Sequence, residues 1–204
     1  MLPPHAHVTF YRRNLPHWQP EGASLFITWR LHGTLPRHLA AACTGKSACA
    51  TSESAGLQFR RWDKELDRAR FGPRWLSDSR VASCVLDAIL HGAEPLGQYR
   101  LRAYVIMPNH VHLLIDPYSS VARITRGIKG VSARHGNRIL GRVGQAFWQD
   151  ESFDHWVRTE EELGKIRFYI ELNPVRAGLT RHPEEWPWSS VSCGKKSKPA
   201  SGDI

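Results

Sequence analysis

Two histidines separated by one residue, His110 and His112, lie in the segment 104–116. They are predicted to stand at the start of a β-strand. Side chains at positions i and i+2 of a strand share one face, about 6.6 Å apart along the chain, so both imidazoles can bind a single divalent cation. A second element, predicted to be helical, carries Tyr169 and Asn173 one turn apart. These two residues offer a nucleophile and a third metal ligand.

The predicted metal shell is incomplete. Two imidazoles and the side-chain oxygen of Asn173 leave positions for water and for the oxygens of a phosphodiester, whereas a structural zinc site would be closed by four ligands. Mg²⁺ or Mn²⁺ therefore fits better, and such a cation would polarise a phosphoryl group and stabilise charge on the leaving oxygen. The phenol of Tyr169 would lie within reach of that phosphate. Since a phenol is mostly protonated at neutral pH, we expect Lys165 and Arg176 to supply positive potential that assists its attack.

Each of these residues has a structural alternative. A His-x-His pair on a strand is more often a surface or core feature than a ligand pair, a helical tyrosine usually packs, and asparagine before proline usually belongs to a turn. The joint occurrence of all four residues favours the chemical interpretation. Attack by tyrosine on phosphorus would conserve the bond energy in a phosphotyrosine link and permit a later rejoining step, which attack by water would not.

The composition predicts a single basic domain. The chain has 204 residues, 41% of them hydrophobic, which suffices for one core and is too little for two full domains. A formal charge of +9 favours a polyanionic partner, with nucleic acid first. No stretch approaches the roughly 20 apolar residues of a membrane span, and the start of the chain lacks the features of a secretory signal, so we expect a cytoplasmic protein without a membrane partner. The four cysteines form no Cys-x-x-Cys pair and predict neither a disulfide framework nor a zinc ribbon.

Periodicity places the candidate residues on defined elements. We expect strands at 24–32, 99–107, 111–115 and within 145–158, and helices at 57–70, 76–91, 121–140 and 160–172. The third strand would turn Val111, Leu113 and Ile115 to the core and leave the histidine face free for a site. Pro174 disfavours helical geometry at the preceding residue, so the last helix should end or kink at Asn173.

This order of elements is typical of an α+β fold, a ferredoxin-like or RNA-recognition-like antiparallel sheet with helices packed on one side. We expect one catalytic domain over 1–192, with a flexible loop at 36–56 and a disordered basic tail at 193–204. Trp186 and Trp188 are expected to pin the C-terminal segment to the body. The basic row on the helix 121–140 is equally compatible with an ordinary solvated face and with a DNA-facing stripe; it comprises Arg123, Arg126, Lys129, Arg134 and Arg138.

Four blocks of the sequence, taken together, resemble the REP-associated tyrosine transposases. These enzymes belong to the HUH superfamily of single-strand DNA endonucleases and are relatives of the single-tyrosine transposases of small bacterial insertion sequences. The blocks occur in the family's order within a resemblance that runs from about residue 12 to residue 190, and they are 107–115, 148–155, 169–179 and 186–190.

The resemblance implies a metal-dependent enzyme that nicks and rejoins single-stranded DNA beside a palindromic hairpin, through a covalent 5′-phosphotyrosine. Carried onto this chain, His110 and His112 are the histidine pair of the motif. Tyr169 is the nucleophile and Asn173 takes the place of the third metal-binding side chain. The HUH endonuclease fold of the family is ferredoxin-like, in agreement with the predicted order of elements.

The resemblance also implies DNA contacts and leaves the assembly open. Arg12 and Arg13 match the family's N-terminal segment and are expected near DNA, and Lys129 matches a lysine expected to contact the strand. The insertion-sequence relatives act as dimers, whereas the hairpin-associated members resemble monomeric enzymes. Single-stranded and hairpin DNA are therefore the expected partners of a monomer or a homodimer.

Two other functions compete with this interpretation. A non-enzymatic nucleic-acid-binding module or repressor could keep the fold and the charge without turnover, although the intact histidine pair and Tyr169 argue against it. A hydrolase of small nucleotides is disfavoured, because a histidine-triad enzyme would need a third histidine where this chain has Leu114.

Overall fold

A four-stranded antiparallel sheet in the order β4-β5-β3-β6 forms the centre of the computed structural model. The structure describes residues 8–12, 16–20, 22–35 and 52–192, and it describes side chains for 22–35 and 59–192. The sheet is built from β3 (Leu25–Arg30), β4 (Tyr99–Ile106), β5 (His110–Pro117) and β6 (Phe153–Trp156). A separate antiparallel hairpin pairs β1 (Val8–Arg12) with β2 (Pro16–Pro20).

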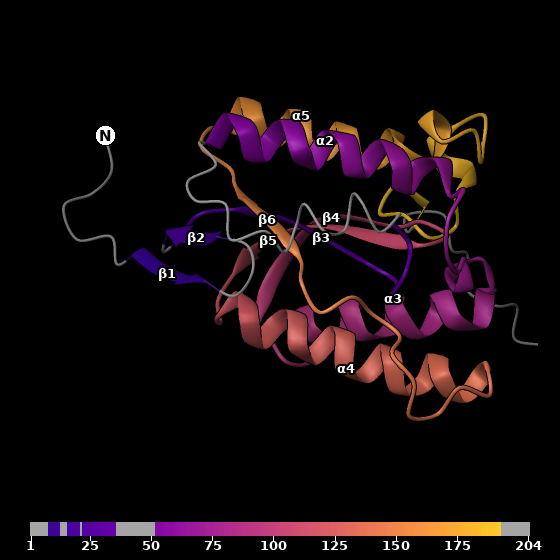
Figure 1. Cartoon of the computed structure of the whole chain (residues 1–204). Helices are drawn as coiled ribbons and strands as arrows, with labels where there is room; N and C mark the ends of the chain where they lie inside the picture. Colours follow the sequence, from indigo (N-terminus) through magenta and orange to yellow (C-terminus); the bar gives the residue numbers. More distant parts are fainter. Residues whose placement is uncertain (1–7, 13–15, 21, 36–51, 193–204) are drawn as a thin grey trace, which may run out of the picture.

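Helices cover both faces of the sheet, so the molecule has three layers (Figure 1). On one face lie α2 (Ser52–Arg68) and α5 (Glu160–Arg176), and on the other lie α3 (Ser79–Ala93) and α4 (Val121–Ile139). Two short 3-10 turns, η1 (Trp75–Ser77) and η2 (Pro183–Glu185), complete the described elements. The predicted α+β class and antiparallel sheet are confirmed, but the expectation of helices on one side is wrong because both sets of alternating strand residues are buried.

The face toward α3 and α4 carries the larger hydrophobic core. Val111, Leu113 and Ile115 of β5 point to this face, as predicted, and their Cα partners on β3 are Trp29, Ile27 and Leu25. All three β5 residues are fully buried, with 0% of their surface exposed. Burial of this apolar surface, at roughly 25 cal/mol per Å², is the main stabilising contribution of the layer.

The face toward α2 and α5 has a smaller apolar cluster and a polar centre. Phe26, Val105 and Leu114 pack against Ile170 of α5 in this cluster. His110 and His112 emerge on the same face and are fully buried, each with 0% of its surface exposed. The prediction that the histidine face is left free is therefore wrong: α2 and α5 cover it.

The β4–β5 connection fixes where the histidine pair begins. The predicted turn residues Pro108 and Asn109 join the two strands, and the Met107 amide donates to the His110 carbonyl at 2.9 Å. Antiparallel pairing follows at once, with Ile106 opposite Val111. His110 is thus the first residue of β5, at the end of the sheet where the chain turns back.

Helix α5 runs one turn farther than the sequence predicted. Thr159 caps its start by accepting a hydrogen bond from the Glu162 amide, and the helix continues through Pro174 to Arg176. Pro174 removes a single i to i−4 hydrogen bond near the end of the helix, and the Ala177 amide still donates to the Asn173 carbonyl at 2.9 Å. Asn173 therefore stays helical.

The remaining predictions about organisation have mixed outcomes. Helix α2 begins at Ser52, inside the segment 36–56 expected to be a loop, while 36–51 and the expected tail 193–204 lie outside the described residues. Trp186 donates from its indole to the Ile106 carbonyl at 3.0 Å, and the Trp188 carbonyl accepts from the Ile106 amide, so the C-terminal segment is pinned to β4 as predicted. None of the described helices is long and apolar enough to cross a membrane.

Candidate active site

The two histidines of β5 converge on one point. Their Nε2 atoms are 3.1 Å apart, although a pure strand geometry would hold the side chains about 6.6 Å apart at their bases. Each ring is also held at its other nitrogen: His110 Nδ1 lies 2.7 Å from Asn109 Oδ1, and His112 Nδ1 lies 2.7 Å from Thr28 Oγ1.

Asn109 determines which nitrogen of His110 carries the proton. Its amide nitrogen donates to the Leu66 carbonyl at 3.0 Å, which leaves the amide oxygen facing His110 Nδ1. An amide oxygen can only accept, so Nδ1 must donate and Nε2 keeps its lone pair. This lone pair points toward His112, as expected of a ligand set that holds a cation.

A carboxylate from α2 joins the pair. One Oδ1 oxygen of Asp63 lies 3.3 Å from His112 Nε2 and 4.0 Å from His110 Nε2, and the residue is only 3% exposed. Asp63 is not among the site residues predicted from the sequence. The available signal was its position, because Asp63 falls on the apolar stripe of the predicted helix, between Trp62 and Leu66, where an unpaired acid is costly.

The amide of Asn173 also reaches the cluster. Its Nδ2 lies 3.2 Å from His112 Nε2, and its Oδ1 is buried without a hydrogen-bond partner. A half-turn of the amide about its last torsion exchanges the two atoms and would turn the oxygen to the histidines. Tertiary structure therefore brings the predicted third side chain into contact with the histidine pair, beside the unpredicted Asp63.

The donor set fits a divalent cation. Ligand atoms from Asp63, His110 and His112 lie within 4.8 Å of one another, and all three residues are buried. Ligands about 2.1 Å from one octahedral cation are separated by roughly 3 Å when adjacent and roughly 4 Å when opposite, which matches the observed spacings. The buried oxygens without hydrogen-bond partners include Oδ1 of Asp63 and of Asn173, so a cation would satisfy groups that the protein leaves bare.

Burial and neighbouring ionisable groups shift the pKa values of the residues in the site. Burial, reinforced by the neighbouring His112, lowers the pKa of His110 to about 3, so this imidazole is neutral and able to bind a metal. Burial alone would raise the pKa of Asp63, but its electrostatic and hydrogen-bond interactions with His112, and the smaller effects of His110 and Arg176, lower it overall. Burial and then the charge of Asp63 raise the pKa of Asp67, one helical turn farther along α2, to about 7.

The candidate nucleophile lies beside this cluster. The ring of Tyr169 is centred 5.7 Å from the His112 ring and 6.2 Å from that of Phe26. Tyr169 lines a cleft of about 570 Å³ together with Asp63 and Asp67. The guanidinium of Arg176 sits over its ring, 5.0 Å from the centroid. The phenol ring is thus partly buried in the cleft wall, and it is not enclosed in the core.

The other predicted DNA-binding residues lie elsewhere. Lys165 is exposed and pairs with Glu161 at 2.6 Å. Lys129 lies on the α4 side of the sheet, where its ammonium donates to the Gln149 and Asp150 carbonyls at 2.6 and 2.8 Å. Neither lysine lines the cleft of Tyr169. Arg12 belongs to β1 but its side chain, like the whole of Arg13, lies outside the described residues.

The cleft also has basic side chains that are not among the predicted DNA contacts. They come from α2 at four-residue intervals, and they are Arg60, Lys64 and Arg68. The signal was available, because this spacing places side chains in one row of a helix.

Comparison with known proteins agrees with the geometry. Residues 78–173 match the family model described as "Transposase IS200 like". A curated protein of Haemophilus influenzae (strain ATCC 51907 / DSM 11121 / KW20 / Rd) that carries the name REP-associated tyrosine transposase is 26% identical over 99 residues, which are 43% of this chain and 56% of that protein. The match thus spans about half the length of the curated relative.

A solved structure of a REP-associated tyrosine transposase bound to a REP hairpin has the same fold. It aligns with 96% of this chain and 93% of its own, with a TM-score of 0.50 and 17% identity. The family segment 78–173 begins just before α3 and ends at Asn173, so it contains the histidine pair, Tyr169 and the third predicted ligand. These matches agree with the resemblance seen in the sequence: residues 78–173 are similar to the IS200-like transposase family, part of the chain is similar to a curated REP-associated tyrosine transposase, and the fold is like that of the solved structure.

Proposed function

We propose that this protein is a metal-dependent enzyme that nicks and rejoins single-stranded DNA beside a palindromic hairpin. One observation carries the proposal: the ring of Tyr169 lies 5.7 Å from His112, on the wall of a cleft that is also lined by Asp63, the carboxylate of the candidate metal site. A phenol and a cation placed this close together can act on the same phosphate. We further propose that it acts in the cytoplasm as a monomer or a homodimer.

His110, His112, Asp63 and Asn173 would hold Mg²⁺ or Mn²⁺, since their donors are two imidazole nitrogens and two oxygens. When bound, such a cation would polarise the phosphoryl group and stabilise charge on the leaving oxygen. Thr28 and Asn109 orient the two imidazoles through their Nδ1 atoms, so that both Nε2 atoms face the cation position.

Tyr169 would supply the covalent step. Its hydroxyl oxygen attacks the phosphorus, a Tyr–O–P bond forms and the P–O3′ bond breaks; the phenol proton passes to water in the open cleft, and the leaving 3′-oxygen takes up a proton from water. The products are a 5′-phosphotyrosine and a free 3′-hydroxyl. Attack of a 3′-hydroxyl on the phosphotyrosine reverses the step and rejoins a strand. Arg176, 5.0 Å above the phenol ring, provides positive charge for the phosphate and for the developing phenolate.

The DNA partner follows from charge and from the site. A formal charge of +9 favours a polyanion, and single-stranded DNA exposes its phosphates to a cleft of this size. Arg176 is the proposed DNA contact with the strongest support, because it lines the cleft. Arg12, Arg13, Lys129 and Lys165 remain proposed contacts for the flanking DNA.

The test is a search for a covalent adduct. The protein is mixed with single-stranded hairpin oligonucleotides and either Mg²⁺ or Mn²⁺, then denatured and resolved by gel electrophoresis. We expect a denaturant-resistant protein–DNA adduct that Tyr169→Phe abolishes while hairpin binding persists, since the ring and its packing remain. Tyr118→Phe is the matched control, because Tyr118 is 68% exposed and lies outside the cleft.

Two outcomes would count against the proposal. An adduct formed by Tyr169→Phe would show that another nucleophile is used. Hairpin binding without an adduct in either metal would favour the non-enzymatic DNA-binding protein instead.

A further inference from the structure

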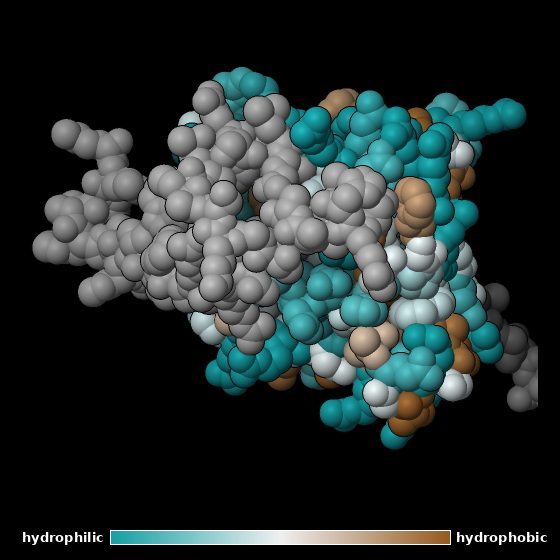
Figure 2. Space-filling view, in the orientation of Figure 1, coloured by the Kyte–Doolittle hydropathy of each residue, from teal (hydrophilic) through white to brown (hydrophobic). Residues whose placement is uncertain are grey.

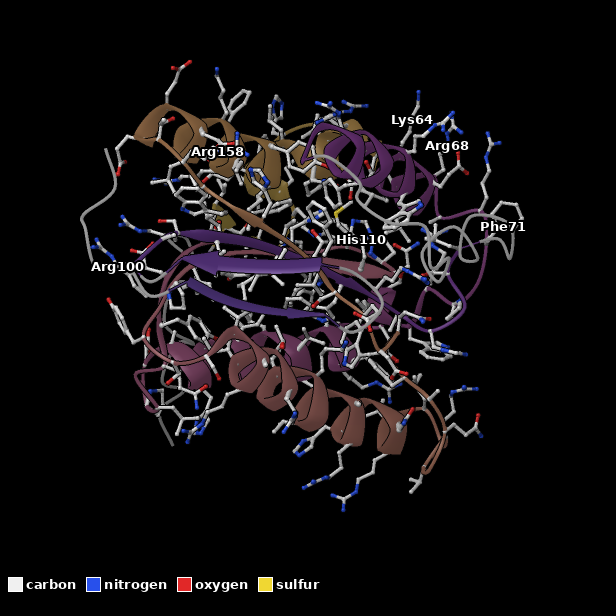
Figure 3. All side chains as sticks on the ribbon, turned by 60° about the vertical axis from the view of Figure 1, so that its left-hand side comes forward. Lys64, Arg68, Phe71, Arg100, His110 and Arg158 are labelled. Atoms are coloured by element: carbon white, nitrogen blue, oxygen red, sulfur yellow. The ribbon has the colours of Figure 1, made fainter. Side chains whose placement is uncertain are left out.

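The outer row of helix α2 forms a cationic rim on the active-site cleft. Arg60, Lys64 and Arg68 follow one another at four-residue intervals, about 6 Å apart along the axis, and all three are exposed and line the cleft. Arg176 faces them from α5. Figure 3 shows Lys64 and Arg68 projecting outward from α2, with His110 in the interior of the molecule.

The rim and the interior of the cleft differ in charge. Asp63 and Asp67 occupy the row of α2 that turns inward to the histidines, with side chains 4% and 18% exposed. On the outer row, Arg68 pairs with Glu65 at 2.5 Å, while Arg60 and Lys64 have no ion-pair partner among the residues with described side chains. A polyanion can therefore lie along the rim while one of its phosphates enters the cleft.

An exposed aromatic residue stands just beyond this row. Phe71 is 48% exposed in the turn after α2. Two neighbours fix the turn: Ala69 has a left-handed φ of 45°, and Gly72 has a φ of 73° and lies so close to Gly33 that a Cβ would come 2.3 Å from its carbonyl oxygen. The turn is thus held by close backbone packing, and it presents Phe71 to solvent beyond Lys64 and Arg68 (Figure 3).

We propose that α2 and the following turn guide the single strand on one side of the scissile phosphate. The row Arg60, Lys64 and Arg68 binds successive backbone phosphates, and a base stacks on Phe71. A row of cations that ends at an aromatic ring is the combination that binds single strands without reading their sequence. This inference rests on the proposed function, because it requires single-stranded DNA at Tyr169.

The second basic helix is placed differently. Arg134 and Arg138 of α4 have the same four-residue spacing and are exposed, but α4 lies across the sheet from the histidines. The sequence of α4 is equally compatible with an ordinary solvated face and with a DNA-facing stripe. Position now favours α2 as the DNA-guiding helix and a solvated face for these two arginines.

The phosphate contacts are tested by salt dependence. Binding of a fluorescein-labelled, hairpin-free single-stranded oligonucleotide is measured by anisotropy in chelator over a range of salt concentrations. The slope of log affinity against log salt is negative, and each lost phosphate contact makes it shallower by about 0.7, so Arg60→Gln/Lys64→Gln should make it shallower by roughly 1.4. Arg134→Gln/Arg138→Gln removes the same charge at the same spacing and should leave the slope unchanged. Equal slopes for the two double variants would overturn the inference.

The stacking contact is tested with the same oligonucleotide. Phe71→Ala should weaken binding roughly 5- to 150-fold, the range measured for loss of one base-stacking aromatic, and Phe71→Trp should restore it. The control is Phe168→Ala, which removes an aromatic side chain that is 63% exposed on α5 and lies outside the cleft. Unchanged binding by a folded Phe71→Ala variant would overturn the stacking contact.

The same proteins are assayed for the Tyr169 adduct, which separates this inference from the proposed function. If wild type forms the adduct but the α2 and Phe71 variants bind like their controls, the inference fails and the function stands. If no adduct forms in either metal but the α2 variants lose affinity and salt dependence, the function fails and the DNA-guiding role of α2 stands.

Discussion

The two faces of the sheet use the same strands for different purposes. Toward α3 and α4, residues such as Trp29 and Leu113 are buried among apolar neighbours. Toward α2 and α5, the alternate positions include Thr28 and His112, and buried oxygens such as Oδ1 of Asp63 have no hydrogen-bond partner. Since adjacent strand residues point to opposite faces, one strand can stabilise the fold with one set of side chains and hold a reactive site with the other.

The contrast also shows how the fold tolerates the free-energy cost of burying a polar site. The buried imidazole of His110, the ionised carboxylate of Asp63 and oxygens without hydrogen-bond partners are all costly to place in an apolar interior. The larger core on the opposite face offsets this cost. On the outside, the described part of the surface seen in Figure 2 is mostly hydrophilic, with hydrophobic residues in small separate patches.

The largest expected effect is on the free energy of unfolding, when two fully buried residues on opposite faces of β5 are each replaced by alanine. Leu113→Ala should lower the free energy of unfolding by about 2–5 kcal/mol, because it leaves a cavity in the main core. His110→Ala should lower it less, because the imidazole is already costly to bury, but should abolish metal binding. Urea unfolding in chelator measures the first effect and metal titration the second. Equal losses of stability would show that the two faces contribute alike.

Asp63 offers a sharper test of the second face. Asp63→Asn removes the only carboxylate of the described triad and should weaken Mn²⁺ binding about 100-fold or more. The readout is the rise in Tm on adding Mn²⁺, which grows with concentration over Kd. Asp87→Asn, at an exposed position of α3, removes the same charge and should keep the full rise. An undiminished rise in Asp63→Asn would exclude Asp63 as a ligand.

A smaller effect is expected from the residue that orients His112. Thr28→Val keeps the shape of the side chain but removes the hydroxyl that lies 2.7 Å from His112 Nδ1. We expect Mn²⁺ affinity to fall about 10-fold, the lower end for loss of such an orienting contact. Thr28→Ser should retain most of the affinity. If Thr28→Val binds Mn²⁺ as wild type does, the hydroxyl does not position the imidazole.

The smallest expected effect concerns stability and pH. The pKa of Asp67 is raised by burial and by Asp63 to about 7, above the roughly 3.9 of an unfolded chain, so the folded state binds its proton more tightly. This carboxyl therefore costs stability progressively as pH rises from about 4 to 7, and the cost is constant above that range. In chelator, Asp67→Asn should stabilise the protein by about 1–3 kcal/mol at pH 8 and by little at pH 4, as measured by thermal unfolding. A gain of equal size at both pH values would contradict this account.

Much of the candidate site was predictable because its parts obey local periodicity. His110 and His112 were expected on one face of a strand, and Tyr169 and Asn173 on one face of a helix, and the structure brings both pairs together. Asp63 was not predicted. Its position on the apolar stripe of a helix is a signal, but that position alone does not tell whether the carboxylate stays at the surface or binds a metal.

The sequence by itself determined which residues share a face, because the repeat of a strand or helix is a property of the backbone. Only the tertiary structure decided that α2 lies over the histidine face, bringing Asp63 to His112 and the row Arg60, Lys64 and Arg68 to the rim of the cleft. That decision depends on packing between segments far apart in the chain. It follows from burying both faces of one sheet, and no short stretch of sequence encodes it alone.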